Sequence, residues 1–349
     1  MRKRIAIIGN FGDVSKQASD GQTIKTRVVT NELIKYYGED EVITFNTYGG
    51  IINLFKAPII CIKALCKASN VIIFPAYNGV RVFAPLLSIL SFFFINCRLH
   101  YCVIGGWLPS FIKNKPILSK SLKGFYAIYV ETYTMKDNLN KDDFENVEIM
   151  PNFKDVKIIE NRNLETGSSM PYKLCTFSRI MREKGIGDAV EVITKINTKL
   201  NKVVYQLDIY GNIDEKQIEW FQELQSSFPE YISYKGCVDY NKSVETLQNY
   251  FALLFPTYYE GEGFAGTIID AFAAGLPVIA TDWKYNAEIV KNNICGYIYP
   301  TRDNNALCKL LEDIYQNPSK VADLKNNCLE AAKQYLPKQA LSVLINNIK

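Results

Sequence analysis

Residues 256–282 hold the most informative pattern in this chain. There an apolar strand leads into a glycine-rich loop, the loop leads into an apolar helix, and the helix passes through a glycine into a second strand. The segment reads Pro256-Thr-Tyr-Tyr-Glu260-Gly-Glu262-Gly-Phe-Ala-Gly266-Thr-Ile-Ile-Asp270-Ala-Phe-Ala-Ala-Gly275-Leu-Pro-Val-Ile-Ala-Thr-Asp282. Strand, loop, helix and strand in this order are typical of a doubly wound α/β domain.

The loop of this segment has the chemistry of a ligand site. It ends at a helix N-terminus, where free backbone N–H groups and the helix dipole favour a phosphate or another anion. Glu262 lies on the loop and Asp270 lies a turn or so into the helix. Both carboxylates can therefore accept hydrogen bonds from the vicinal hydroxyls of one ligand, such as a ribose or a hexose. The alternative is that Glu262 is a solvated loop acid and Asp270 only stabilises the helix N-terminus.

The same alternation of apolar strands and helical segments continues on both sides of residues 256–282. It predicts parallel sheets that are covered on both faces. Strands are expected at residues 5–8, 42–45, 71–74, 99–104, 127–130, 147–150, 174–178, 205–210, 232–234, 252–255 and 277–280. We therefore predict an α/β fold of two Rossmann-like doubly wound parallel-sheet domains that face each other across a cleft. The cleft is the expected site, because such sheets bind ligands beyond the carboxyl ends of their strands.

The pattern also divides the chain. Residues 1–152 are expected to form the first domain, residues 153–335 the second, and residues 336–349 a C-terminal helix that packs back on the first domain. The division falls near residues 151–171, where hydrophobic periodicity is weak and polar residues are frequent. Further helices are expected at residues 304–316, 319–334 and 338–348, and Pro318 and Pro337 suit the starts of the last two.

Part of residues 256–282 resembles the signature of family 4 of the glycosyltransferases, which are retaining enzymes of the two-domain GT-B architecture. The matching residues are Glu262-Gly263-Phe264-Ala265 and Asp270-Ala-Phe-Ala-Ala-Gly275-Leu-Pro-Val278. Asp270 stands where the family has a glutamate, and Ala265 stands where it has a glycine. The shorter acid is expected to reposition a bound ribose, and the alanine narrows the approach of the backbone to the ligand.

The resemblance implies roles for the donor side. Glu262 would contact the hydroxyls of the donor sugar and Asp270 the nucleotide ribose. Arg179 and Lys184, in a segment similar to the family's Gly-Arg-Leu-x-x-x-Lys-Gly, would neutralise the leaving diphosphate. The other residues that the resemblance places at the donor are Gly211, Val238, Gly263, Phe264, Ala265, Gly266 and Thr267. The alternative interpretation of Arg179 and Lys184 is that they are surface cations near the start of a helix.

The first domain matches the family less sharply. Two short segments, Gly9-Asn-Phe-Gly12 and Asp20-Gly21-Gln22-Thr23, resemble its glycine-rich loop, although Gly12 and Gly21 read equally well as ordinary turn residues. Many members carry a histidine after the fourth strand, where this chain has Gly105-Gly106-Trp107. His100 lies at the start of that strand and is expected to be a packed residue. The expected acceptor side is therefore Gly12, Gly21, Gln22, Gly105, Gly106 and Trp107.

Composition excludes several classes of protein. With 40 Lys and Arg against 36 Asp and Glu, the chain lacks the charge of a dedicated nucleic-acid binder. Its nine cysteines are odd in number and form no Cys-x-x-Cys pair, so free thiols in a reducing compartment are expected. With one histidine and no clustered ligands, no metal site is predicted. The N-terminus lacks a signal peptide and the apolar run 82–97 is too short to cross a bilayer, so a cytoplasmic location is expected.

The positive charge is unevenly distributed. Residues 42–130 contain no Asp or Glu and nine cations, so the rest of the chain is net negative. The cations are Lys56, Lys63, Lys67, Arg81, Arg98, Lys113, Lys115, Lys120 and Lys123. Cations beside an apolar helix predict contact with anionic lipid headgroups, and the alternative is a buried helix with scattered lysines.

The resemblance implies a retaining hexosyltransferase, which we expect to be independent of metal ions and to need no cofactor. The resemblance implies a nucleoside-diphosphate-sugar donor. Two segments of the chain are similar to segments of bacterial capsule and O-antigen enzymes: Glu-Gly-Glu-Gly-Phe and Ile-Gly-Gly-Trp-Leu-Pro. This similarity implies a lipid-linked saccharide as the acceptor. We expect a peripheral protein on the inner face of the membrane. The alternative function is a non-catalytic GT-B scaffold subunit that supports a membrane-associated glycosyltransferase.

Overall fold

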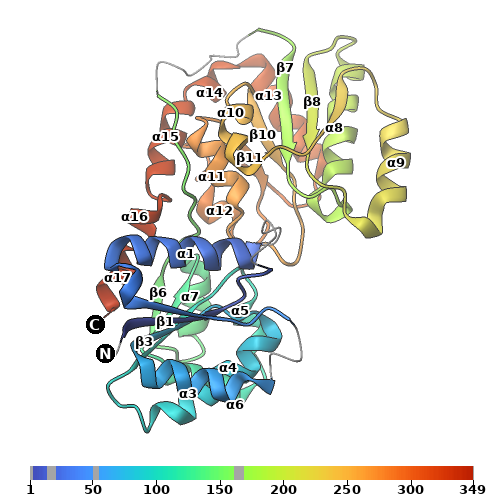
Figure 1. The fold of residues 1–349 in the computed structure, drawn as a ribbon. Helices are drawn as coiled ribbons and strands as arrows, with labels where there is room; N and C mark the ends of the chain where they lie inside the picture. The colour runs from blue at the N-terminus through green and yellow to red at the C-terminus, as the bar shows by residue number, and fades with distance from the viewer. Residues whose placement is uncertain (1–2, 14–20, 50–54, 161–168, 349) are drawn as a thin grey trace. The chain divides into compact units, whose positions relative to one another are not determined.

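The computed structural model describes residues 3–13, 21–49, 55–160 and 169–348. The chain forms two compact units. Unit 1 comprises Met1–Pro151 and Ala340–Lys349, and unit 2 comprises Asn152–Gln339. Each unit contains a six-stranded parallel sheet with helices packed on it (Figure 1). Asp20, at the start of one of the glycine-rich segments, lies outside the described residues.

The sheet of unit 1 has the strand order β2-β1-β3-β4-β5-β6. Its strands are β1 (Lys3–Gly9), β2 (Val42–Asn46), β3 (Ala68–Ile73), β4 (Arg98–Cys102), β5 (Ala127–Val130) and β6 (Val147–Ile149). The central strands are buried on both faces, which explains why they read as continuous apolar runs. The chain moves outward in opposite directions from β1 and β3, so the sheet reverses its order between these two strands.

Helices cover both faces of this sheet, with α1 on one side and α3, α4 and α6 together on the other (Figure 1). Unit 1 contains α1 (Gly21–Tyr37), α3 (Ala57–Lys67), α4 (Tyr77–Ser91), α5 (Leu108–Ile112), α6 (Pro116–Lys123), α7 (Tyr133–Asn140) and α17 (Ser342–Asn347), with a 3-10 turn at Glu39–Glu41. Hydrogen bonds fix the C-terminal segment to the unit, among them one from the Asn347 side-chain amide to the Tyr129 hydroxyl at 3.2 Å. Tyr37 donates its hydroxyl to the Ile345 carbonyl at 3.2 Å, and Arg98 donates to the Asn347 carbonyl at 2.9 Å.

The sheet of unit 2 has the order β12-β11-β10-β7-β8-β9. Its strands are β7 (Tyr172–Phe177), β8 (Tyr205–Tyr210), β9 (Ile232–Gly236), β10 (Ala252–Phe255), β11 (Val278–Thr281) and β12 (Gly296–Tyr299). Leu174 in β7 pairs with Leu207 on one side and with Ala252 on the other. The order therefore reverses between β7 and β10, which are neighbours in the sheet although far apart in the chain.

The helices of unit 2 form two groups, one of α8 with α13 and one of α11 with α10 and α15. The α-helices are α8 (Ile186–Lys199), α9 (Ile218–Ser226), α10 (Ser243–Leu247), α11 (Gly266–Ala273), α12 (Asn286–Ile289), α13 (Asn304–Gln316), α14 (Ser319–Ala322) and α15 (Lys325–Lys333). Short 3-10 turns occupy Arg182–Lys184, Glu215–Gln217 and Tyr240–Lys242. Helix α16 (Pro337–Ala340) spans the division between the units.

The two parallel sheets with flanking helices confirm the predicted fold class, with three local differences. Strand β12 was not among the expected strands. The expected helices 319–334 and 338–348 are each divided in two, because α14 ends at Ala322 before α15 begins and α16 ends at Ala340 before α17 begins. The apolar run 82–97 is helical only to Ser91, where α4 ends. In the described part of the chain, no helix combines the length and the apolarity needed to cross a membrane.

Candidate active site

The candidate site of unit 2 lies where the strand order reverses. The loop that follows β7 and the loop that follows β10 leave the same edge of the sheet side by side, because these parallel strands are neighbours. The first loop carries Arg179 and Lys184, and the second carries Glu262. Open parallel sheets bind ligands at this kind of position.

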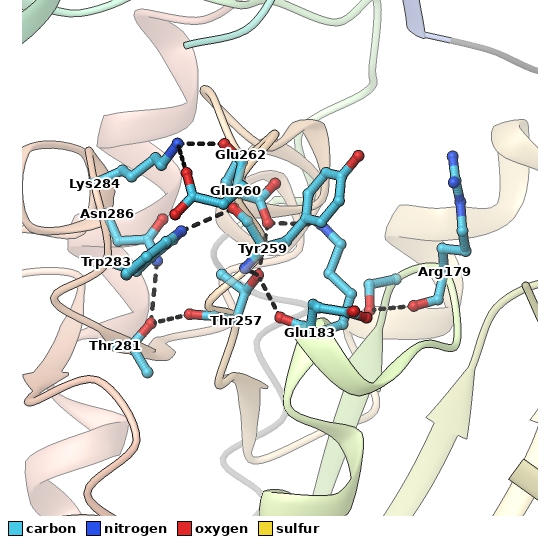
Figure 2. A network of polar contacts seen from close by, with 12 residues as sticks. Arg179, Glu183, Thr257, Tyr259, Glu260, Glu262, Thr281, Trp283, Lys284 and Asn286 are labelled. Carbon is cyan, nitrogen blue, oxygen red and sulfur yellow. Dashed lines mark hydrogen bonds and ion pairs between the residues drawn. The ribbon is translucent and has the colours of Figure 1, made fainter. Parts of the chain in front are cut away.

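An ion pair joins the two loops. Lys184 Nζ lies 2.6 Å from Glu262 Oε2, and both side chains are nearly buried. The same carboxylate oxygen accepts a hydrogen bond from the hydroxyl of Thr257 at 2.8 Å. The ammonium group also lies 5.0 Å from the centre of the Tyr259 ring. Figure 2 shows Thr257 and Tyr259 beside Glu262.

Backbone contacts keep the two loops in close register. The amide of Tyr258 donates to the carbonyl of Glu183 at 2.8 Å. Gly185, the residue after Lys184, has a φ of 70°. A Cβ at this position would lie 2.2 Å from the Pro256 carbonyl oxygen. Only glycine combines this conformation with such a close approach. The glycine therefore allows Lys184 to reach Glu262.

A second set of contacts, made by residues at and after the end of β11, holds the loop after β10. Trp283 donates its indole N–H to the Tyr259 carbonyl at 2.8 Å, and Thr281 donates its hydroxyl to the Thr257 carbonyl at 2.6 Å. Lys284 forms an ion pair with Glu260 at 2.8 Å. Glu260 is exposed, whereas Glu262 points inward (Figure 2). The two neighbouring acids thus have different surroundings.

Asp270 has a lysine partner of its own, which the sequence patterns did not indicate. Lys154 Nζ lies 2.7 Å from Oδ1 and 2.6 Å from Oδ2 of Asp270. Burial raises the pKa of the Asp270 carboxyl, while the charge and hydrogen bond of Lys154 and a hydrogen bond with Ser243 act in the opposite direction. The sequence suggested that both carboxylates face a single ligand. In the structure each carboxylate forms an ion pair with a different lysine.

The other residues expected at the donor lie at the same edge of the sheet. Arg179 is 59% exposed, and its Nη1 lies 3.5 Å from Asp214 Oδ2, so the guanidinium extends away from Glu262 (Figure 2). Gly211 follows β8, and a Cβ there would lie 1.8 Å from the Ser178 carbonyl oxygen. Val238 is half-buried in the loop after β9.

The N-terminus of α11 completes this edge. Gly263 and Phe264 are buried and precede Ala265 and Gly266, where the helix begins. The hydroxyl oxygen of Thr267, in the first turn, is buried and has no hydrogen-bond partner among the described residues. A helix N-terminus with an unused hydroxyl can bind an anionic oxygen.

In unit 1, the expected acceptor residues lie beyond the carboxyl ends of β1, β3 and β4. Gly12 follows β1 with a φ of 69°, and Gly105 follows β4 with a φ of 80°. Gln22 donates its side-chain amide to the carbonyl of Phe74, directly after β3, at 2.9 Å. The three strands are neighbours, so these positions share one edge of the sheet.

The other expected residues of unit 1 belong to the same loops. Gly21 is the exposed first residue of α1, and Gly106 lies between Gly105 and Trp107. Trp107 is buried and donates its indole N–H to the Ile104 carbonyl at 2.8 Å. Its ring lies 4.2 Å from the ring of Tyr77, which makes it part of an aromatic cluster.

Two further polar sites of unit 1 are buried. His100 is fully buried between Tyr129 and Asn70, and burial together with the charge of Arg98 lowers its pKa to about 3. Its packed position agrees with the structural role expected for it. Lys25 on α1 and Glu131 after β5 form a buried ion pair at 2.6 Å, which no sequence pattern indicated.

The family of the chain follows from comparison with known proteins. A family model described as glycosyl transferases group 1 matches residues 158–334, just over half of the 349-residue chain. The chain belongs to this family. Membership of the group 1 glycosyl transferases confirms the resemblance found in the sequence and the expected enzyme class, and the matched residues include both candidate carboxylates of unit 2.

Curated members of the family share limited identity with this group 1 glycosyl transferase. The GtfA subunit of a UDP-N-acetylglucosamine–peptide N-acetylglucosaminyltransferase from Streptococcus pneumoniae is 27% identical over 169 residues, 47% of this chain and 31% of that protein. The amylovoran biosynthesis glycosyltransferase AmsK of Erwinia amylovora is 23% identical over 171 residues, 46% of this chain and 40% of that protein. The chain thus spans about a quarter to two fifths of such relatives.

Solved structures match over nearly the whole chain. The Anabaena protein HepE in complex with UDP has a TM-score of 0.74 at 12% identity and covers 99% of this chain and 98% of its own. The lipopolysaccharide outer core galactosyltransferase WaaB has a TM-score of 0.73 at 13% identity, with the same coverage. At these identities the likeness shows the fold, and it confirms the GT-B architecture of this group 1 glycosyl transferase.

Proposed function

We propose that the chain is a retaining, metal-independent glycosyltransferase of bacterial surface polysaccharide biosynthesis. It transfers a hexose from a nucleoside-diphosphate-sugar held by unit 2 to a hydroxyl of a saccharide held by unit 1. One observation carries the proposal: the buried Lys184–Glu262 pair lies where the strand order of unit 2 reverses. This pair puts a cation and a hydrogen-bond acceptor at the place where an α/β sheet binds its ligand.

Each part of the donor has a matching group. Glu262 orients the sugar by accepting hydrogen bonds from its hydroxyls. Lys184 and the exposed Arg179 neutralise the charge that develops on the leaving diphosphate, and the N-terminus of α11 with the Thr267 hydroxyl adds donors for phosphate oxygens. These two cations supply the stabilisation of charge that a metal ion would otherwise give. Asp270 binds the ribose.

The comparisons support the choice of substrates. HepE was solved with UDP, which favours a UDP-sugar as the donor. AmsK is named for amylovoran biosynthesis and WaaB for the lipopolysaccharide outer core, which favours a saccharide that is assembled on a lipid as the acceptor. The residues of unit 1 beyond β1, β3 and β4, including Gln22 and Trp107, are the proposed acceptor side.

A face of unit 1 supports a membrane location for this reaction. Helix α4 packs against α3 and α6, and these helices with the turn after α4 expose large apolar side chains next to lysines. The exposed apolar residues are Phe55, Ile59, Ile62, Ile89, Phe92, Phe93, Ile95 and Ile117, and the exposed lysines are Lys56, Lys63, Lys67, Lys120 and Lys123; Phe55 and Lys56 directly precede α3. We call this set the basic apolar face. With no acid in residues 42–130, it fits the surface of an anionic bilayer at the inner side of the cell membrane.

Liposome co-sedimentation tests the membrane part. Wild type is expected to bind vesicles that contain anionic lipid and to lose binding as salt is raised. Phe92→Ser/Phe93→Ser is expected to weaken binding at low salt, whereas Lys202→Glu, an exposed lysine of unit 2, serves as the matched control. Equal binding to neutral vesicles, or no binding at low salt, contradicts this part of the proposal.

A thermal-shift screen of UDP-, GDP-, ADP- and CMP-sugars tests the donor, because a ligand that binds the native state raises its stability. The bound donor is then assayed for transfer, and the configuration of the product is determined by NMR. Glu262→Gln is expected to lower transfer by about 10²-fold or more. Full transfer by this variant would contradict the role of Glu262, and an inverted product would contradict retention.

The second candidate function is a non-catalytic scaffold subunit, favoured by the GtfA relatives, which are named as subunits. The intact Lys184–Glu262 pair weighs against it, because a scaffold has no use for a nearly buried ion pair at a ligand-binding edge. Calorimetry with nucleoside diphosphates separates the two functions. Absence of binding by every nucleotide favours the scaffold.

A further inference from the structure

The ribose side of the proposed donor site contains an unexpected charge. Lys154 belongs to the segment after Pro151-Asn152-Phe153, at the start of unit 2. Its ammonium contacts both oxygens of Asp270, and the two side chains are 12% and 3% exposed. Of the two partners, Lys154 is therefore the one that a ligand reaches first.

The path of the Lys154 side chain brings it to the N-terminus of α11. A Cβ placed on Gly266, the first residue of this helix, would lie 3.5 Å from Lys154 Cδ. The ammonium group then lies 4.2 Å from the centre of the Tyr240 ring, in the 3-10 turn after β9. The lysine thus crosses from the phosphate-binding end of α11 toward the loop that carries Val238.

The start of the connector is itself fixed to unit 2. Asn152 donates its side-chain amide to the Phe264 carbonyl at 2.8 Å, and the Lys154 amide donates to the Tyr335 carbonyl at 3.1 Å. These contacts hold the backbone on both sides of Phe153. The ammonium group is therefore held in place by its own backbone as well as by Asp270.

A carboxylate paired with an ammonium matches the chemistry of a diol. Each hydroxyl of a diol has one proton to donate and an oxygen that accepts, so it can donate to Asp270 and accept from Lys154. The aspartate is one methylene shorter than the family's glutamate, and the lysine brings a long flexible side chain to the same place. A phosphate, in contrast, would interact with the ammonium and be repelled by the carboxylate.

From this arrangement we propose that Lys154 is a nucleotide-binding residue that reads the ribose hydroxyls jointly with Asp270. The inference rests on the proposed donor site. It adds a specificity-determining residue: the Lys154–Asp270 pair distinguishes a ribonucleotide from its deoxy analogues.

Calorimetry with modified nucleotides tests the inference. Wild type is titrated with UDP, GDP and ADP, and the nucleotide that binds best is then compared with its 2′-deoxy and 3′-deoxy forms. Wild type is expected to bind at least one deoxy form about tenfold more weakly, as for the loss of one charge-assisted hydrogen bond. In Lys154→Met this difference is expected to fall below about threefold, and in Lys154→Arg it is expected to persist.

Controls separate recognition from folding. Lys157→Met removes an exposed lysine from the same segment. It should leave the affinities for the ribonucleotide and for its deoxy forms unchanged. Lys154→Met/Asp270→Asn removes both charges, so that no buried carboxylate lacks a partner, and it should show no preference between ribose and deoxyribose.

The outcomes distinguish this inference from the function on which it rests. If Lys154→Met binds the ribonucleotide and its deoxy forms with the wild-type ratio, the lysine does not read the ribose and the inference is wrong, while the donor site stands. If Lys154→Met binds the ribonucleotide and its deoxy forms more weakly than wild type by the same factor, the lysine interacts with the phosphate, and the inference is also wrong. If wild type binds no nucleotide, the proposed function fails together with the inference.

Discussion

Lys184 Nζ lies 2.6 Å from Glu262 Oε2, with only 12% and 8% of the two side chains exposed. A pair so well shielded from water is only weakly screened by salt. In the proposed reaction the pair has to serve two ligand groups at once. The carboxylate faces the hydroxyls of the sugar, and the ammonium faces the phosphate that leaves.

Glu262→Gln keeps the size of the side chain and removes its charge. Because an amide orients sugar hydroxyls less strongly and no longer balances Lys184, we expect transfer to fall by about 10²-fold or more. Steady-state assays with the donor identified by thermal shift measure this. Glu260→Gln, two residues away and exposed, is the matched control and should keep most of the activity. Comparable losses in both variants would contradict the distinction between these acids.

Thr257→Val tests whether the Glu262 carboxylate must be oriented. The Thr257 hydroxyl is buried, donates to the carboxylate at 2.8 Å and accepts from the Tyr259 amide at 3.2 Å, so valine removes both hydrogen bonds without changing the shape of the side chain. We expect about a tenfold loss in kcat, and Thr257→Ser should recover most of it. Thr194→Val, which removes a hydroxyl bonded only to the helix backbone, is the control. An unchanged kcat in Thr257→Val would show that the carboxylate needs no such support.

The strands and the Glu262 position were accessible from the sequence for a physical reason. Strands buried on both faces must be apolar throughout, so a strand such as β10 (Ala252–Phe255) is visible as a short apolar run even when its neighbours in the sheet are not known. Strand β12 was missed because it has four residues, two of them tyrosine, and begins at Gly296. That glycine is needed because a Cβ would lie 2.0 Å from the Val278 carbonyl oxygen.

The partners of the site residues were not accessible in the same way. Lys154 and Asp270 are 116 residues apart, and Lys25 and Glu131 are 106 apart. A single lysine in a segment without periodicity resembles any surface lysine until the fold places an acid beside it. Thr257 lay within the quoted segment, but its role depends on a side-chain direction that spacing does not determine.

The Lys25–Glu131 pair gives a test of stability in unit 1. Lys25→Met leaves Glu131 as a buried charge without this partner, and we expect the free energy of unfolding of unit 1 to fall by about 3–5 kcal/mol. Lys25→Met/Glu131→Gln should recover part of the loss, because no charge is then buried. Trp107 is the single tryptophan of unit 1, so urea unfolding followed by fluorescence in a Trp220→Phe/Trp283→Phe background reports on this unit. A double variant as unstable as the single one would contradict the electrostatic explanation.

His100 predicts how the stability of unit 1 depends on pH. Its pKa is lowered to about 3 in the folded chain, because burial and the Arg98 charge disfavour the protonated ring, whereas an unfolded histidine titrates near 6.5. Below pH 6.5 the unfolded chain therefore binds one proton more than the folded chain. The contribution of the neutral ring to stability is complete above pH 6.5 and is lost as the pH falls toward 3, by up to about 1.4 kcal/mol per pH unit.

His100→Gln removes this pH dependence of stability while retaining polar atoms beside Tyr129 and Asn70. The difference in unfolding free energy between wild type and His100→Gln, followed by Trp107 fluorescence, should therefore shrink by about 2–3 kcal/mol between pH 6.5 and pH 4.5. Other titrating groups are common to both proteins and cancel in this difference, so a constant difference across that range would show that folding does not lower the pKa of His100.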